Sequence, residues 1–290
     1  GWSDTPQILT NDLGIQNNAE AVAHSGGIFV TWNDFQYGNA DILAQFISND
    51  GSVLGQDNGT LLASEATDEY NQVLTYNTFT NEVLVVWEYD NGLDFDIRGS
   101  IIDLDNISIG STFDIAPEYS DQTSPAVYSS SNGTFILMWR DGRLSIPGLP
   151  PVYDIYYQEI GPLGFNYSDN GIAVCDYTYN QDNPSINLLS ESNDSYLLYW
   201  NDMRSTGKQD LVNIYTQSVT IDSSGCILYD VNQDGGVDVL DIVVTIGIIL
   251  NTVETNPDQQ CAADVLLGQN HQAGCRRRNF GADSDPTPID

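Results

Sequence analysis

Basic residues are scarce in this chain. Only 8 Lys and Arg stand against 41 Asp and Glu, which gives the 290 residues a formal net charge of −33. A surface this negative repels phosphates, so nucleic acids and anionic membranes are excluded as expected partners, and cations are favoured. Such an excess of acid is also typical of proteins that work in an extracellular or salty medium.

Long apolar runs are missing too. The longest candidate, VLDIVVTIGIIL at 239–250, contains Asp241 and is shorter than the ~18 residues that a membrane-spanning helix needs. We therefore expect no membrane span. The chain begins GWSD, without Met or an apolar leader, which fits a secreted product whose signal peptide has been removed. The expected location is extracellular or at the cell surface.

Cysteine and histidine are rare, which limits the chemistry. The cysteines are Cys175, Cys226, Cys261 and Cys275, without a C-x-x-C pair, and His24 and His271 are the only histidines. If all four cysteines are bridged, more than one pairing is open. We favour Cys226 with Cys261, because this bridge would clasp the two ends of segment 230–250. No G-x-S-x-G or H-E-x-x-H motif of a hydrolase is present.

What the chain does have is an internal repeat. Four similar strands end in tryptophan, namely GIFVTWNDF, EVLVVWEYD, TFILMWRDG and SYLLYWNDM. Each is followed by a second strand, respectively DILAQFI, DIRGSII, DIYYQEI and NIYTQSV, and preceded by a third, AEAVAHS, NQVLTYN, SPAVYSS or PSINLLS. A further strand, GTLLAS, STFDIA or NGIAVC, lies between units. Four short strands separated by Gly, Asn and Asp turns predict the blade of a β-propeller.

The strands that end in tryptophan are apolar on both faces. In SYLLYW, alternation places Tyr196, Leu198 and Trp200 on one face and Leu197 and Tyr199 on the other. A strand of this kind has to be covered on both sides, as it is between two neighbouring blades. We therefore expect stacked blades with the four tryptophans in the core.

The expected fold is all-β, a propeller of about four four-stranded blades over residues 1–225. The fourth repeat lacks its own last strand, and PQILTNDLGIQ resembles the missing one. We predict that residues near 7–11 close the ring by completing the blade begun around 184–219. Two chains that combine into one larger ring are the alternative. Over residues 1–222 the chain resembles secreted bacterial propeller repeats of the W-x-D-x-R then D-I-Y-x-Q type, a resemblance that concerns the fold.

Acidic residues recur after the tryptophans, at Asp34, Asp141 and Asp202, with Asp90 displaced by one position. A ring of carboxylates is able to bind a cation or to serve as the acid and base of a glycosidase. Residues that recur in every blade more often serve the blade itself, and catalytic groups are usually those that break the repeat. We expect these carboxylates to cap turns or to pair with Arg143 and Arg204, two residues further on.

Two connections are longer than the others. LSIPGLPPVY at 144–153 and STGKQDLV at 205–212, which holds the only lysine, Lys208, lengthen the loops of the third and fourth repeats. Long loops on a rigid scaffold are frequent binding surfaces, and a Pro-rich loop is also a common rigid connector.

The strongest site signal is DVNQDGGVDVLD at 230–241. It places oxygen ligands at alternate positions around Gly235, in the order Asp230, Asn232, Asp234, the carbonyl of Gly236, Asp238 and Asp241. Ca²⁺ takes about six to eight such hard oxygens, and this is the spacing of an EF-hand loop, with Asp in place of Glu at the last position. We therefore predict a bound Ca²⁺.

DVNQDGGVDVLDIVVTIGIIL resembles the first repeat of a type I dockerin, an EF-hand-like module that binds cohesin domains. The resemblance implies the same six calcium ligands, and it implies that Val239 and Leu240 face the partner, together with the apolar helix that carries Ile246. The second repeat, which begins at CAADV, lacks the ligand pattern and is degenerate. We assign residues 226–268 to this module and residues 269–290 to a flexible, acidic, Pro-containing tail.

Together these features predict a secreted, non-catalytic binding or assembly protein that attaches through protein–protein interaction to a cohesin-like or other extracellular partner. Two alternatives stay open. One is an extracellular carbohydrate-active propeller enzyme, glycosidase-like, that uses the dockerin-like module as its anchor. The other is a structural subunit of a filament or surface layer, which would associate with itself.

Overall fold

The structure, a computed structural model, describes residues 6–161, 164–167, 170–204 and 212–221, together with 243, 244 and 246. This part of the chain is all-β, with one short 3-10 helix, η1 (Glu191–Asn193), and with Val243, Val244 and Ile246 in helical conformation. Within these ranges no helix is both long and apolar enough to cross a membrane.

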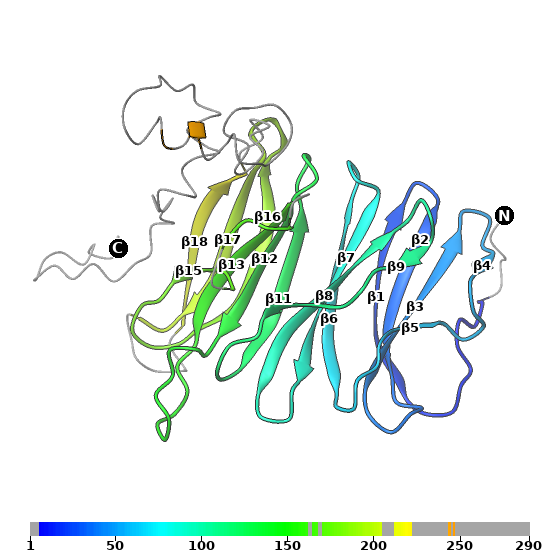
Figure 1. The fold of residues 1–290 in the computed structure, drawn as a ribbon, viewed down its shortest axis with the longest axis horizontal. Helices are drawn as coiled ribbons and strands as arrows, with labels where there is room; N and C mark the ends of the chain where they lie inside the picture. The colour runs from blue at the N-terminus through cyan, green and yellow to red at the C-terminus, as the bar shows by residue number, and fades with distance from the viewer. Residues whose placement is uncertain are drawn as a thin grey trace, which may run out of the picture.

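The strands form four antiparallel sheets, which we call blades 1 to 4 in chain order (Figure 1). Blade 1 contains β1 (Gln16–His24), β2 (Gly27–Asp34), β3 (Asp41–Ser48), β4 (Val53–Leu54) and β5 (Thr60–Ala63). Blade 2 contains β6 (Glu69–Asn77), β7 (Glu82–Asp90), β8 (Phe95–Asp103), β9 (Ser108–Ile109) and β10 (Phe113–Ala116). Blade 3 contains β11 (Gln122–Ser129), β12 (Phe135–Asp141), β13 (Asp154–Gly161), β14 (Gly164–Phe165) and β15 (Ile172–Cys175). Blade 4 contains β16 (Gln181–Ser190), β17 (Ser195–Asp202) and β18 (Asn213–Thr220).

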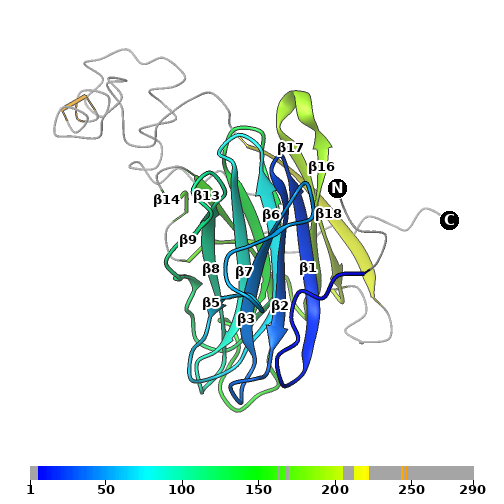
Figure 2. The same ribbon diagram turned by 90° about the vertical axis from the view of Figure 1, so that its right-hand side faces the viewer.

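This arrangement confirms the predicted all-β class and the predicted strand order, and it is consistent with a β-propeller. In blades 1 to 3 the strand that ends in tryptophan lies between the two strands expected beside it, and the outer strand pairs with the third strand. A two-residue strand, which the repeat did not predict, extends each of these blades. The first strands of successive blades, β1, β6, β11 and β16, lie next to one another, and we call them the inner strands (Figures 1 and 2).

Apolar side chains fill the three spaces between neighbouring blades. One core joins blades 1 and 2 around Phe29 and Val85, one joins blades 2 and 3 around Leu84 and Leu137, and one joins blades 3 and 4 around residues that include Leu198. The four tryptophans are at most 3% exposed, as predicted for core residues. The recurring strand is therefore the packing unit of the fold.

The predicted ring closure by residues 7–11 is wrong for the described structure. These residues form no strand, and the chain beside them is bound to blade 1. The backbone N–H of Asn11 donates to Asn58 Oδ1 at 3.1 Å, and Asn58 Nδ2 donates to Asp12 Oδ1 at 2.9 Å. These hydrogen bonds to Asn58 hold the segment against blade 1. In the described ranges blade 4 has three strands.

The two end blades are covered on one side only by a neighbouring blade. In blade 4, Tyr196, Leu198 and Trp200 are buried against blade 3, while Leu197 and Tyr199 on the opposite face are partly exposed. Strands β7 and β12 of the interior blades are buried along most of their length. Coverage of both faces, as predicted for all four strands, therefore holds for blades 2 and 3.

Candidate functional site at the inner strands

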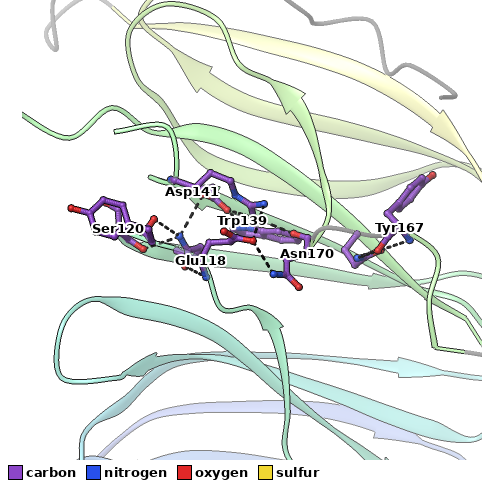
Figure 3. Close-up of polar contacts among 10 residues, drawn as sticks. Glu118, Ser120, Trp139, Asp141, Tyr167 and Asn170 are labelled. Atoms are coloured by element: carbon purple, nitrogen blue, oxygen red, sulfur yellow. Dashed lines mark hydrogen bonds and ion pairs between the residues drawn. The ribbon is translucent and has the colours of Figure 1, made fainter. Parts of the chain in front are cut away.

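The acidic residues after the tryptophans are structural. In blade 3 the indole Nε1 of Trp139 donates to Asp141 Oδ2 at 2.7 Å, and the backbone N–H of Arg143 donates to Asp141 Oδ1 at 2.8 Å (Figure 3). The Arg143 guanidinium pairs with the fully buried Asp141 carboxylate at 2.6 Å and donates to the carbonyl of Asn170 at 3.1 Å. Glu118 lies beside them and accepts from Asn170 Nδ2 at 2.8 Å (Figure 3). The cluster clasps the end of one strand to the following loop.

Blade 4 repeats this clasp. Trp200 Nε1 donates to Asp202 Oδ2 at 3.1 Å, and Arg204 binds the same carboxylate through its backbone N–H at 2.7 Å and through Nε at 2.9 Å. The Arg204 guanidinium also lies over the ring of Tyr215 at 4.0 Å. The predicted turn caps and Asp–Arg pairs are thus present in blades 3 and 4.

Blades 1 and 2 depart from the clasp in different ways. In blade 1, Asp34 accepts from the Trp32 indole and from the backbone N–H of Gln36, which stands in place of arginine. In blade 2, Tyr89 stands where the other blades have the acid, and the buried Trp87 Nε1 has no hydrogen-bond partner. The neighbouring Asp90 caps the Gly92 N–H at 2.7 Å. The recurring acids therefore serve the blades and do not form a ring of equivalent binding groups.

Each inner strand carries a bulge at the same position. The register shifts near the start of β1, β6, β11 and β16. One residue in each bulge has a left-handed φ, namely Asn18 at 55°, Asn71 at 50°, Ser124 at 56° and Asn183 at 51°. Bulges of this kind interrupt backbone pairing and redirect side chains, and they are frequent beside active sites. They leave polar groups at the innermost part of the blades.

The residue directly after each tryptophan is a position at which the repeat varies, and in blades 1 to 3 its side chain contacts the inner strands. It is Asn33 in blade 1, Glu88 in blade 2, Arg140 in blade 3 and Asn201 in blade 4. Asn33 Nδ2 donates to the carbonyl of Glu69 in the next blade at 3.0 Å. Glu88 and Arg140 bring opposite charges to this position in adjacent blades.

Glu88 is held by both neighbouring bulges. Its Oε1 accepts from the backbone N–H of Ser124 at 2.7 Å, and its Oε2 accepts from Asn71 Nδ2 at 2.9 Å. The residue is 6% exposed. Burial raises the pKa of the Glu88 carboxyl, and the two hydrogen bonds and the charge of Arg140 only partly offset this increase. Glu88 is a fixed carboxyl group with a raised pKa at the inner edge.

Arg140 connects the same region to blade 4. Its Nε donates to Thr123 Oγ1 at 2.9 Å, and its Nη1 forms an ion pair with Asp182 at 3.4 Å, whose side chain is 33% exposed. The guanidinium lies over the ring of Tyr153 at 4.1 Å, and the Tyr153 hydroxyl donates to Asp121 Oδ2 at 3.0 Å. We call Glu88, Asp121, Arg140, Tyr153 and Asp182 the inner-edge cluster.

The inner-edge cluster combines groups suited to acid–base chemistry. A buried carboxyl whose pKa is raised is able to donate a proton near neutral pH, and a more exposed carboxylate nearby acts as a base or nucleophile. Sequence reasoning missed these residues because it considered the recurring acids. The signal was present in the strings WND, WEY, WRD and WND, in which the middle residue changes.

The sequence-predicted calcium and attachment residues fall elsewhere. The ligands Asp230, Asn232, Asp234, Gly236, Asp238 and Asp241, the partner-facing Val239 and Leu240, and Cys226 and Cys261 lie outside the described residues. Ile246 is described, in helical conformation and 50% exposed. In the ranges that the structure covers, no group of three or more His, Cys, Asp or Glu is arranged to hold a metal ion.

No protein-family model and no curated protein matches this chain. Solved structures do resemble it. A thermostable family-43 glycoside hydrolase is 13% identical, with a TM-score of 0.43 over 71% of this chain and 72% of that chain. An exo-1,5-α-L-arabinanase from a bovine ruminal metagenomic library is 11% identical, with a TM-score of 0.42 over 72% and 75% of the two chains. An endo-1,4-β-xylanase from Bacteroides thetaiotaomicron is 10% identical, with a TM-score of 0.43 over 74% and 75%.

These matches correct one sequence-based prediction. The propeller was expected to be non-catalytic, and the similar structures named above are glycoside hydrolases, so that prediction is wrong. At this level of identity the similarity assigns no residue roles.

Proposed function

We propose that this chain is an extracellular carbohydrate-active propeller enzyme of the glycosidase type, with the inner-edge cluster as its active site. The observation that carries the proposal is Glu88, which breaks the repeat and is held by two inner-strand bulges beside Arg140. Glycoside hydrolysis requires little more than a carboxylic acid that is protonated at working pH and a second carboxylate. The cluster holds a buried carboxyl whose pKa is raised and a second, more exposed carboxyl group.

The roles follow from the environments of the two carboxyl groups. In this proposal Glu88 is the general acid, which gives a proton to the glycosidic oxygen as the bond to the leaving sugar breaks. Asp182, ion-paired to Arg140 and one-third exposed, is the second carboxylate. It attacks the sugar or activates water, depending on the separation of the two carboxyl groups once substrate is bound. Arg140 fixes the position of Asp182.

The charge of the molecule restricts the substrate. A net charge of −33 disfavours uronic-acid-rich and sulfated polysaccharides, because like charges repel at long range. Neutral polysaccharides carry no such penalty. We therefore expect activity on neutral chains.

The first test is hydrolysis by Glu88→Gln. The amide keeps one of the two hydrogen-bond acceptors and has no acidic proton to transfer, so release of reducing ends from a panel of soluble neutral polysaccharides should fall about 10²–10⁴-fold. Glu82→Gln is the matched control, because Glu82 starts the same strand at its opposite end. Wild-type rates in Glu88→Gln, with thermal unfolding unchanged, would refute the role of Glu88.

The dockerin-like segment 226–268 belongs to this proposal as a calcium-dependent anchor to a cohesin-like extracellular partner. What supports it is the spacing of oxygen-bearing residues from Asp230 to Asp241. Bound Ca²⁺ would neutralise acidic side chains that otherwise repel one another, and its binding free energy would stabilise the ligated loop.

A calcium titration tests the anchor. We expect the metal-free protein to bind one Ca²⁺ per chain by calorimetry, and Asp234→Ala to bind it at least about tenfold more weakly, because a charged ligand is lost. Asp103→Ala, in an exposed turn of blade 2, should bind as the unsubstituted protein does. Failure of the metal-free protein to bind calcium would refute the anchor and leave the enzyme proposal standing. Sizing with and without chelator would detect the self-association that a filament subunit requires.

A further inference from the structure

Tyr179 has a backbone conformation that is unusual for an aromatic residue. It lies between β15 and β16 with a φ of 74°, in the left-handed region that bulky L-residues avoid, and its side chain is 49% exposed. Strained backbone persists only where surrounding contacts hold it, and it is concentrated at functional sites. The equivalent positions in the other blades show whether the fold requires this conformation.

The left-handed turn itself is part of the repeat. Gln181, fully buried at the start of β16, donates through Nε2 to the carbonyl of Tyr179 at 2.7 Å. In blade 3, Gln122 donates in the same way to the carbonyl of Ser120 at 2.8 Å, and Ser120 has a φ of 70°. In blade 1 the residue two before the equivalent Gln16 is Gly14, with a φ of 124°.

Blade 2 lacks the left-handed turn. There Glu69 replaces the glutamine, and the residue two positions earlier, Thr67, does not have a positive φ. In blades 3 and 4 the glutamine amide binds the carbonyl of the left-handed residue, whereas in blade 1 Gly14 adopts the turn although Gln16 Nε2 has no hydrogen-bond partner. The turn is made with glycine or serine in the other blades, so the fold does not require an aromatic side chain at this position.

Tyr179 is also close to the inner-edge cluster. The next residue, Asn180, accepts from the backbone N–H of Tyr153 at 3.1 Å, and the backbone N–H of Gln181 donates to the carbonyl of Tyr153 at 2.8 Å. Asp182 follows directly and pairs with Arg140. The nearby Tyr177, 42% exposed, differs because its ring packs against the Arg204 guanidinium at 4.7 Å.

We infer that Tyr179 is a binding residue for a neutral polysaccharide, on whose ring one sugar unit stacks beside Asp182. The inference rests on the proposed function for the class of substrate. A phenol ring offers an apolar face to the C–H groups of a sugar and a hydroxyl to its edge, and it loses little side-chain entropy on binding. Binding of a sugar would account for an exposed tyrosine at this strained position. The turn itself does not require tyrosine, because serine and glycine adopt it in blades 3 and 1.

The test is Tyr179→Gly, with Ser120→Gly as the matched control at the equivalent turn. Both substitutions relieve the left-handed strain, so the Tm of each should rise by about 2–4 °C, the shift that one kcal/mol gives in a protein of this size. In affinity electrophoresis with soluble arabinan, arabinoxylan and β-glucan, Tyr179→Gly should bind the retarding polysaccharide at least about tenfold more weakly. Ser120→Gly should bind as wild type does.

The outcomes separate this inference from the proposed function, because retardation measures binding and reducing ends measure hydrolysis. Tyr179→Gly that binds as wild type, or that unfolds at a lower temperature, overturns the inference even if the wild-type enzyme hydrolyses the polysaccharide. Binding that is lost in Tyr179→Gly while the wild type hydrolyses nothing supports the inference and refutes the glycosidase. A wild type that none of the three polysaccharides retards overturns both.

Discussion

Glu69 shows how one residue makes the stability of this protein depend on pH. It occupies the position of Gln16, Gln122 and Gln181 in the other blades, and it is fully buried. Its Oε1 accepts the backbone N–H of Glu65 at 2.9 Å, while burial raises the pKa of the carboxyl to about 7. Because the pKa is higher in the folded than in the unfolded chain, the folded protein holds the proton more tightly.

The sign of the effect follows from this difference. Below pH 4.5, the ordinary pKa of the group, both states are protonated and the contribution to stability is fully present. It is lost progressively as the pH rises through about 7, because the folded state then has to bury a charge. The native protein should therefore be less stable at pH 8 than at pH 5 as far as this group is concerned.

Glu69→Gln restores the residue of the other blades and removes the titration. We expect its free energy of unfolding at pH 8 to exceed that of wild type by about 1–2 kcal/mol, allowing for solvent screening. At pH 4 the two proteins should differ little. Urea unfolding at both pH values measures this, and an equal difference at the two would show that protonation of Glu69 is not the cause.

At this scale the sequence predicted only part of the site. Trp139, Asp141 and Arg143 recur with fixed spacing, and recurrence indicates a structural role, so the clasp was foreseen. Glu88 and Arg140 were not, because the contacts of Glu88 come from two bulges, at Asn71 in its own blade and at Ser124 in the next, which no local pattern reveals. A raised pKa depends on burial by other elements and is invisible in one strand.

At the scale of the strand, the repeat depends on close contact between glycine and tryptophan. Gly59 and Gly171 precede the outer strands of blades 1 and 3, and a Cβ atom on either would lie 2.5 Å from the Cη2 atom of Trp32 or Trp139. Both glycines have a positive φ, 97° and 93°. The outer strand is thus able to approach the third strand only because the residue before it has no side chain.

Gly171→Ala should therefore disturb blade 3. The added methyl group meets both the Trp139 ring and the carbonyl of Tyr157, at 2.7 Å, and overpacking of this kind costs about 1–3 kcal/mol of unfolding free energy. Gly148→Ala is the control, because its φ of 84° is similar and no atom lies within 4 Å of its Cβ position. Thermal unfolding compares them, and equal losses of Tm would mean that backbone strain, not the contact with Trp139, is responsible.

Element prediction worked where apolar alternation and turn residues agreed. The strand GTLLAS is found as β5 and SYLLYW within β17. It failed for residues 7–11, whose resemblance to an outer strand is outweighed by the hydrogen bonds of Asn11 and Asp12 to Asn58. Element prediction also missed the bulges, because a left-handed asparagine within a strand cannot be recognised from the alternation of apolar and polar residues.

For the whole molecule, composition and repeat number predicted the class but not the geometry. The repeated strands led to an all-β propeller, with which the stacked sheets are consistent (Figure 1). Ring closure is a property of the way all blades meet, and it does not follow from the sequence of any one of them. The coverage of the outermost blades likewise became apparent only in the structure.

Three separate apolar cores join the four blades, so the effect of a destabilising substitution depends on the blade in which it lies. A defect in blade 2 or blade 3 weakens two cores at once, whereas a defect in blade 1 or blade 4 weakens one. In such a row the outermost members detach at the lowest cost and the middle pair comes apart last. Glu88 and Arg140 belong to that middle pair, whereas Asp182 belongs to blade 4, so partial unfolding from that end would remove the second carboxylate of the proposed site while its acid stayed in place.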